Sequence, residues 1–473
     1  MPAPASAKAS GPATTGPEEP SGPALPVRVP LVSESWGILR TLSTARRNLL
    51  EILPEIAMTQ PIVSGKTGKR WHMVMDPPSL RLILKEKVAD YPKSIVTKNI
   101  LRPAIGDSLF VAEGAHWHWQ RRAAAPVFSM RNIENLAPVM THAAERASAR
   151  LSEVAGTGRA GDLHREMVTA TFEVISDVTF SGDEGFDRAA IHEAIDAYID
   201  QIARISLLDI FGLPEWVPRP ARLMSARVVR QMKAMADRTI EARRASIRDG
   251  ERPPDLLDLL LAGEDPRTKR RMTTPELRDN LLTFIVAGHE TTALTLSWAL
   301  YLCAFAPEVQ EAARAEARTV LGGRAAGAGD VARLPLVRRI IDEALRLYPP
   351  AAMLSRTARK TDRICGREIR AGDTVIIPIY ALHRNRLLWE DADAFVPERF
   401  AEPGAIDRFA YLPFGAGPRV CIGAGFAIQE AVIILATLLA RFRFHAVPGR
   451  DPRPVMILTL RPEGGVWLEV EPV

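Results

Sequence analysis

The chain has 473 residues, of which 47% are hydrophobic and 25% are charged, and its formal net charge is +5. This balance is ordinary for a globular protein and supplies enough apolar residues for a sizeable core. The basic residues are dispersed, without a dense Lys/Arg stripe and interleaved aromatics, which argues against nucleic acid binding. A basic patch for an acidic electron-transfer partner stays open.

The three cysteines, Cys303, Cys365 and Cys421, form no disulfide framework, which favours a reducing compartment. No run of about 18 apolar residues and no signal-peptide pattern occurs, so we expect a cytoplasmic protein without a transmembrane anchor. Residues 1–25 are mostly Pro, Ala, Gly, Ser and Thr and are predicted to be a disordered tail. Residues 26–473 are expected to form one domain.

Secondary structure in the first quarter of the chain is predicted from its breakers and short apolar runs. Arg70–Met75 is predicted as a strand and Ser79–Lys87 as a short helix. Residues 91–111 mix Pro103 and Gly106 with isolated apolar residues and are predicted to form a long loop.

Residues 113–122 are predicted as a helix on which Trp117 and Arg121, four apart, share one face. His116 and His118 alternate, so they point away from each other on a helix. Solvated histidines are therefore expected rather than a metal site.

From Ile133 to Arg248 the pattern is helical, with breaks at residues 211–214 and 218–220. The apolar stretch 202–213 fits either a lid over a channel or ordinary core, and the sequence does not decide between them.

A long helix is predicted from Thr274, a good N-cap, and Pro275, a good first helical residue. Nothing but Gly288 interrupts it before Pro307, so it covers about 45 Å, enough to cross a domain. Helical spacing puts five residues on one face: Phe284, Ala287, Gly288, Thr291 and Thr295.

The small residues on this face leave a groove, or else they allow tight helix packing. The Thr291 hydroxyl could bond the carbonyl four residues earlier and loosen the helix locally. His289 lies off the face and is expected to be packed or solvated.

Leu334–Leu347 is predicted as a helix, and its Glu343 and Arg346, three apart, can pair on one face. Such pairs are usually surface salt bridges of little energetic weight. Further on, residues 367–369 and 374–378 are predicted as two strands joined by a turn, and residues 457–473 as a hairpin.

The stretch Phe414–Gly423 places one cysteine among glycines and beside an arginine, just before an apolar helical run at 426–439. Backbone N–H groups in a first helical turn favour a thiolate and lower the pKa of Cys421. The glycines would let a flat, bulky group approach the sulfur, and Arg419 could reach a carboxylate on that group. A buried structural cysteine is the alternative.

This stretch resembles the haem-thiolate signature of the cytochrome P450 family, Phe-x-x-Gly-x-Arg-x-Cys-x-Gly, at every fixed position. The resemblance implies that Cys421 is the axial ligand of a haem b iron and that Arg419 contacts a haem propionate. Phe414 and Gly423 also belong to the implied cofactor site. A cysteine ligand pushes electron density onto the iron and favours O–O cleavage.

Other motifs resemble the same family in the same order. Trp117, Arg121 and Arg356 match residues that hold propionates, and Ala287–Thr292 resembles the oxygen-activation motif, which implies proton delivery by Thr291 and Glu290 beside Ala287 and Gly288. The implied structural network is Glu343, Arg346 and Arg399, the last within Pro397–Phe400. His383 lies where the family often has a polar residue near the haem edge.

The family fold implied is mainly α with a small β-rich portion, in a single haem-binding domain of a soluble, bacterial-type member. The implied reaction inserts one oxygen atom from O2 into a C–H bond of a hydrophobic small molecule. A fatty acid is favoured by analogy, and a terpenoid or aromatic compound is plausible. Electrons would come from a separate ferredoxin or flavoprotein.

Two other functions stay open. A peroxide-driven haem-thiolate enzyme usually lacks the acid–threonine pair found in this chain. A haem-based ligand sensor without turnover is the second alternative.

Overall fold

The computed structural model describes residues 24–33, 37–180, 220–245 and 254–473. The predicted tail at 1–25 lies almost wholly outside these residues, and so does the apolar stretch at 202–213. The helices are α1 Ile38–Arg47, α2 Pro77–Arg81, α3 Ile95–Ile105, α4 Gly114–Ala124, α5 Met130–Val154, α6 Leu163–Phe180, α9 Pro220–Ala245, α10 Leu256–Ala262, α11 Thr274–Phe305, α12 Pro307–Leu321, α13 Pro335–Leu347, α14 Ile379–Leu382 and α15 Ala424–Arg441.

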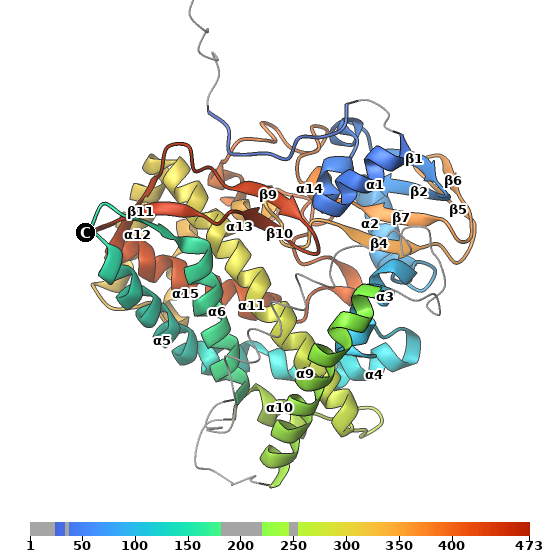
Figure 1. The fold of residues 1–473 in the computed structure, drawn as a ribbon, viewed down its shortest axis with the longest axis horizontal. Helices are drawn as coiled ribbons and strands as arrows, with labels where there is room; N and C mark the ends of the chain where they lie inside the picture. The colour runs from blue at the N-terminus through green and yellow to red at the C-terminus, as the bar shows by residue number, and fades with distance from the viewer. Residues whose placement is uncertain (1–23, 34–36, 181–219, 246–253) are drawn as a thin grey trace, which may run out of the picture.

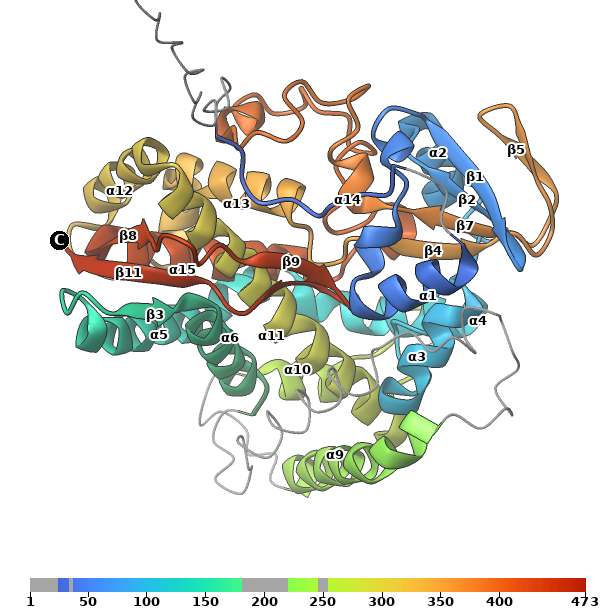
Figure 2. The same ribbon diagram turned by 45° about the horizontal axis from the view of Figure 1, so that its top comes forward.

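The helix α11 runs through the centre of the molecule, between a helical part and a β-rich part (Figure 1). It begins with a capping box in which Thr273 and Glu276 bond each other's backbone N–H groups, one residue earlier than the predicted cap. Pro307 stops it, as predicted, because proline cannot continue the ladder of hydrogen bonds. Helices α5, α6, α12 and α15 gather on one side of α11 (Figure 2).

A four-stranded sheet on the other side has the order β1-β2-β7-β4. Its strands are β1 Ile62–Thr67, β2 Lys69–Val74, β7 Thr374–Ile377 and β4 Leu354–Thr357. Only the β2–β7 pair is parallel. The smaller sheets contain β3 Ala160–Asp162, β5 Asp362–Ile364, β6 Arg367–Ile369, β8 Phe442–Ala446, β9 Arg453–Met456, β10 Leu460–Glu463 and β11 Trp467–Pro472. The prediction of a mainly α protein with a small β-rich portion is confirmed.

The predicted loop at 91–111 is wrong, because this segment contains α3. The Ser94 side chain accepts a hydrogen bond from the Thr97 backbone and caps the helix. Ile100, Leu101 and Ile105 bury its apolar face. Pro103 lies inside the helix near its end, so it removes one hydrogen bond without preventing the helix.

The predicted hairpin at 457–473 is also wrong. β10 pairs back onto β9, whereas β11 pairs with β8 and β3. Gly464 and Gly465, both at positive φ, turn the chain away between β10 and β11. The apolar content of these strands suggested pairing, but the partners come from distant segments.

Helix α15 is long and apolar enough to cross a membrane, with a mean hydropathy of 1.6, and so is the pair α11 and α12 taken together. The pair bends by 114° at Pro307, and 67% of the apolar window of α15 is buried in the protein. Gln429 and Glu430 interrupt the apolar run of α15. Packing among α5, α12 and α13 accounts for its composition, as expected of a core helix.

Candidate active site

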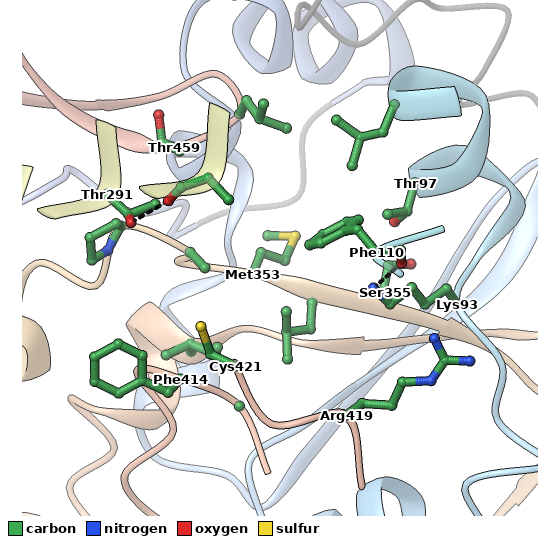
Figure 3. Close-up of a pocket in the computed structure, with 18 of the residues that line it drawn as sticks. Lys93, Thr97, Phe110, Thr291, Met353, Ser355, Phe414, Arg419, Cys421 and Thr459 are labelled. Carbon is green, nitrogen blue, oxygen red and sulfur yellow. Dashed lines mark hydrogen bonds between the residues drawn. The ribbon is translucent and has the colours of Figure 1, made fainter. Parts of the chain in front are cut away.

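A cavity of about 790 Å³ lies between the middle of α11 and the loop that carries Cys421. In Figure 3, Cys421 lies below and to the left of the centre, Thr291 and Thr459 lie above it, and Arg419 and Lys93 lie to its right. Much of the remaining lining is aliphatic or aromatic, and parts of it come from α1, α3, α6, β2 and β4. One continuous space therefore joins a thiol, a set of cations and an apolar compartment.

The loop before α15 turns the Cys421 side chain into this cavity. The Cys421 backbone N–H donates to the Phe414 carbonyl at 2.9 Å, which closes the loop. Gly417 has a φ of +70°, and a Cβ there would lie 2.0 Å from the Leu84 carbonyl oxygen. Glycine at 417 is therefore required by the backbone packed behind the loop, not by room for a flat group as the sequence suggested.

The Cys421 thiol is exposed to the cavity and otherwise enclosed by protein, and this desolvation raises its pKa. A hydrogen bond from the Gly423 N–H and the charge of Arg121 oppose the rise without cancelling it. The expected lowering of the Cys421 pKa is wrong because desolvation by the surrounding protein outweighs the Gly423 N–H and the charge of Arg121.

The groove predicted on α11 exists. Ala287, Gly288 and Thr291 line the cavity, and Phe284 and Thr295 line it as well. The Thr291 hydroxyl donates to the Ala287 carbonyl at 2.8 Å, as its spacing predicted. His289 faces away, is buried, and its ring Nδ1 lies 3.0 Å from the Ile285 carbonyl, which confirms packing.

Glu290 lies at the edge of the cavity, and residues far along the chain hold its carboxylate. The Oε1 atom accepts hydrogen bonds from the Thr459 hydroxyl at 2.7 Å and from Arg461 Nε at 2.6 Å. Among the described residues, Oε2 accepts none. Sequence reasoning missed Thr459 and Arg461, because no spacing rule connects α11 to a strand about 170 residues later.

Four cationic side chains line the opposite end of the cavity: Lys93, Arg121, Arg356 and Arg419. Desolvation is the main reason why the pKa of each is lowered, to about 10 for Arg356 and well below its usual value for Lys93. The neighbouring charge of Arg419 adds to the shift at Lys93 and Arg356. Lys93 was not predicted.

The partners of these cations are few. Arg419 pairs with Glu113, donates to the Ala112 carbonyl at 2.8 Å, and lies 4.2 Å above the Trp117 ring. The Arg121 side chain has neither a hydrogen bond nor an ion pair within the part of the chain that the structure describes. Because a half-buried cation without a partner is partly desolvated at a cost in free energy, this end of the cavity fits a ligand with carboxylate groups.

The side chains that could bind a metal at Cys421 are also few. No cluster of three His, Cys, Asp or Glu side chains that could hold a metal ion exists among the described residues. A metal at Cys421 would therefore bring its other ligands within an organic group. A flat macrocycle that carries two carboxylates satisfies the thiol, the unpaired cations and the open groove over Ala287 together.

A model of the cytochrome P450 family matches residues 32–469. The chain belongs to the cytochrome P450 family. It is 33% identical over 424 residues to cyclooctatin synthase of Streptomyces melanosporofaciens, which covers 88% of this chain and 90% of that protein. It is 33% identical to a cytokinin hydroxylase of Arabidopsis thaliana, over 78% of this chain and 72% of that one. A carotene epsilon-monooxygenase of the same plant, named as chloroplastic, is 29% identical over 87% and 79%.

This P450 is accordingly a haem-thiolate monooxygenase, and the family holds haem b through a cysteine thiolate. Among the cysteines, Cys303 is fully buried in α11 and Cys365 lies in the loop between β5 and β6, so neither faces the cavity. Cys421 does line the cavity, together with the cations that could bind carboxylate groups.

The predicted contacts among Glu343, Arg346 and Arg399 are confirmed, with Glu343 and Arg346 buried and Arg399 half-buried. Two hydrogen bonds of 2.6 and 2.7 Å join Arg346 to Glu343, and neither residue is exposed at all. Arg399 Nε lies 3.5 Å from Glu343. Arg346 also donates to the carbonyls of His383, Ala392 and Ala394.

The placement of His383 near the haem edge is wrong, because His383 does not line the cavity. Its Nδ1 bonds the Arg346 carbonyl at 3.2 Å, and its Nε2 accepts from the Leu412 N–H at 2.8 Å. Burial, aided by the charge of Arg346, lowers the pKa of His383 to about 3. His116 also differs from expectation, since it bonds Trp119 and Gln120, while His118 is exposed.

Proposed function

We propose that this P450 inserts one oxygen atom from O2 into a C–H bond of an apolar small molecule. The observation that supports this most is the single cavity that connects Cys421, the α11 groove and a mainly apolar compartment. Six of the residues that line this compartment are Ile100, Leu101, Phe110, Ile175, Phe284 and Met353. An apolar wall of this kind excludes water and binds substrate largely by burial.

In this proposal Cys421, held in place by its closed loop, would bind the haem iron as a thiolate, and Phe414 and Gly423 would lie beside the cofactor. Arg121, Arg356 and Arg419 bind the haem carboxylates, and Trp117 supports Arg419 from below. The haem supplies the binding and reductive activation of O2. Ala287 and Gly288 keep the groove on α11 open, because larger side chains would fill that space.

Proton delivery is assigned to Thr291 and Glu290. The Thr291 hydroxyl can both donate and accept, so it can leave the Ala287 carbonyl and relay a proton into the groove. Glu290 is fixed through Oε1 by Thr459 and Arg461, which leaves Oε2 to serve as the acid. Both residues line the same cavity.

The substrate class is open to a direct screen. The names of the relatives point to cyclooctatin, cytokinin and carotene, and family analogy adds fatty acids. We propose a separate ferredoxin or flavoprotein as electron donor. We also propose a cytoplasmic location, which the three free cysteines support because thiols stay reduced there. Binding of the right compound displaces water from the iron, which appears as a shift of the Soret band.

The deciding experiment compares two reactions of the haem-loaded protein with the compound found in that screen, one with an electron donor and O2 and one with hydrogen peroxide. A monooxygenase yields hydroxylated product with a reduced electron donor and O2, and isotopically labelled O2 places one labelled oxygen in the product. Product formed only with hydrogen peroxide would show a peroxygenase instead. No product under either condition, with binding retained, would show a ligand sensor.

A further inference from the structure

Glu113 precedes α4 and contacts the cation-rich end of the cavity, yet no part of the reaction described above uses it. One carboxylate oxygen pairs with Arg419, two residues before Cys421. The other accepts a hydrogen bond from the Lys93 backbone N–H at 2.9 Å and lies 3.5 Å from Lys98 Nζ. One side chain thus joins α4, the segment that enters α3 and the cysteine loop.

The charges around Glu113 are strongly unbalanced. Within the described residues, it is the one carboxylate whose charge acts on all three of Lys93, Arg356 and Arg419, where it offsets part of the lowering of their pKa values by burial. Two haem carboxylates would add two more negative charges. The charge of Glu113 is therefore a large part of the total at this end of the cofactor.

The position of Glu113 also bears on the geometry of the cysteine loop. Arg419 is held from three sides, by Glu113, by the Ala112 carbonyl and by the Trp117 ring. The segment at Lys93 is fixed in turn by an isolated β-bridge to Arg356. Loss of Glu113 would leave Arg419 with a carbonyl and an aromatic face but no opposite charge.

We propose that Glu113 is a positioning residue that sets the reduction potential of the haem iron, by holding Arg419 and by cancelling part of the cationic charge beside the cofactor. A negative charge near a redox centre opposes the addition of an electron, and the effect is largest where water is excluded. The inference rests on the haem of the family and on Cys421, not on the identity of the substrate.

The test is a spectroelectrochemical titration of the haem-loaded, full-length protein. Glu113→Gln keeps the size of the side chain and removes its charge, so we expect the midpoint potential to move to a more positive value. Glu113→Asp keeps the charge but shortens its reach, and a smaller shift in the same direction is expected. Glu264→Gln, at a carboxylate paired with Lys269 outside the cavity, should leave the potential unchanged.

A second measurement separates this role from that of a simple helix cap. The free energy of unfolding of the haem-free protein is compared among the same variants. Lower stability together with an unchanged potential in Glu113→Gln overturns the proposal. If Glu113→Gln retains no haem, Glu113→Asp decides, and an unchanged potential in that variant overturns the proposal equally.

Discussion

Two groups of buried charges in this P450 have opposite arrangements. Around Glu343 the charges are paired within the fold. Arg346 forms two hydrogen bonds to Glu343 and donates three more to backbone carbonyls. Around Cys421, the three cations Lys93, Arg356 and Arg419 share the carboxylate Glu113, and the Arg121 side chain has no partner in the described part of the chain.

The difference separates charges that the fold itself neutralises from charges that, under the proposed function, a bound ligand neutralises. A buried ion pair that is complete contributes to one folded state, and removal of one partner is costly because the other charge is stranded. A desolvated cation without a partner lowers the stability of the haem-free protein, and binding of an anion beside it offsets that cost in free energy. The same residue types therefore carry opposite consequences for stability at the two places.

The largest effect is expected at Glu343. Glu343→Gln leaves Arg346 buried without its counter-charge and should lower the free energy of unfolding by about 3–5 kcal/mol. Chemical denaturation of the haem-free protein measures this. Glu86→Gln, which breaks an exposed pair with Arg81, is the control and should cost about 0–1 kcal/mol. Equal losses in the two variants would contradict the distinction.

The next largest effect is a pH dependence of stability that arises at His383, which contacts Arg346 in the group around Glu343. Its pKa is about 3 in the folded protein and about 6.5 when unfolded, so the unfolded chain takes up the extra proton between these values. The stabilisation is complete above about pH 6.5 and is lost as the pH falls toward 3, by roughly 2 kcal/mol at about pH 5.

Urea denaturation at several pH values, in wild type and in His383→Gln, measures this contribution. The variant lacks the titrating ring, so its stability should fall less steeply below neutral pH. Parallel pH curves for the two proteins would show that His383 is not kept neutral by the fold.

At Arg121 we expect a smaller change in the stability of the haem-free protein, and an increase instead of a decrease. Arg121→Met removes an unpaired cation, so the empty protein should be as stable as wild type or more so. Haem affinity should fall about tenfold or more, since a charge-assisted hydrogen bond contributes about 1.5–3 kcal/mol. Haem transfer to an acceptor protein gives the affinity, and Arg318→Met on the surface of α12 is the control. Destabilisation as large as that of Glu343→Gln would refute the assignment.

The smallest effect on stability is expected at Thr291, where only one hydrogen bond to the Ala287 carbonyl is lost and alanine is a better helix former. Thr291→Ala should fold and bind haem as wild type does, yet form less product per electron consumed and release more hydrogen peroxide. Thr295→Ala, one turn further along the same face, is the matched control. Equal coupling in wild type and Thr291→Ala would leave Thr291 as a packing residue.

The sequence identified the residues whose spacing is local. Cys421 with Arg419, Trp117 with Arg121, and the small residues before Thr291 all lie within one loop or one helix turn, and the structure brings them to one cavity. The pair Glu343 and Arg346 was found for the same reason. What decided its burial, namely three backbone carbonyls from a distant segment, was not visible in the pattern.

The contacts that sequence reasoning missed join distant segments. Lys93 reaches the cavity only because the segment before α3 bridges to β4, and Arg461 reaches Glu290 only because β10 pairs back onto β9. His383 was misplaced because a polar residue near a motif does not reveal which way its ring points. The hairpin predicted at 457–473 was wrong because β11 pairs with β3 and β8, which lie elsewhere in the chain, and not with the neighbouring strand β10.

The reduced carbon monoxide complex tests the central claim, that Cys421 holds the haem iron as a thiolate. Wild type should show the long-wavelength Soret band that distinguishes a thiolate ligand from an imidazole. Cys421→His should move this band to the position typical of a histidine ligand, while Cys365→Ser should leave it in place. A Soret band unchanged by Cys421→His would contradict the account.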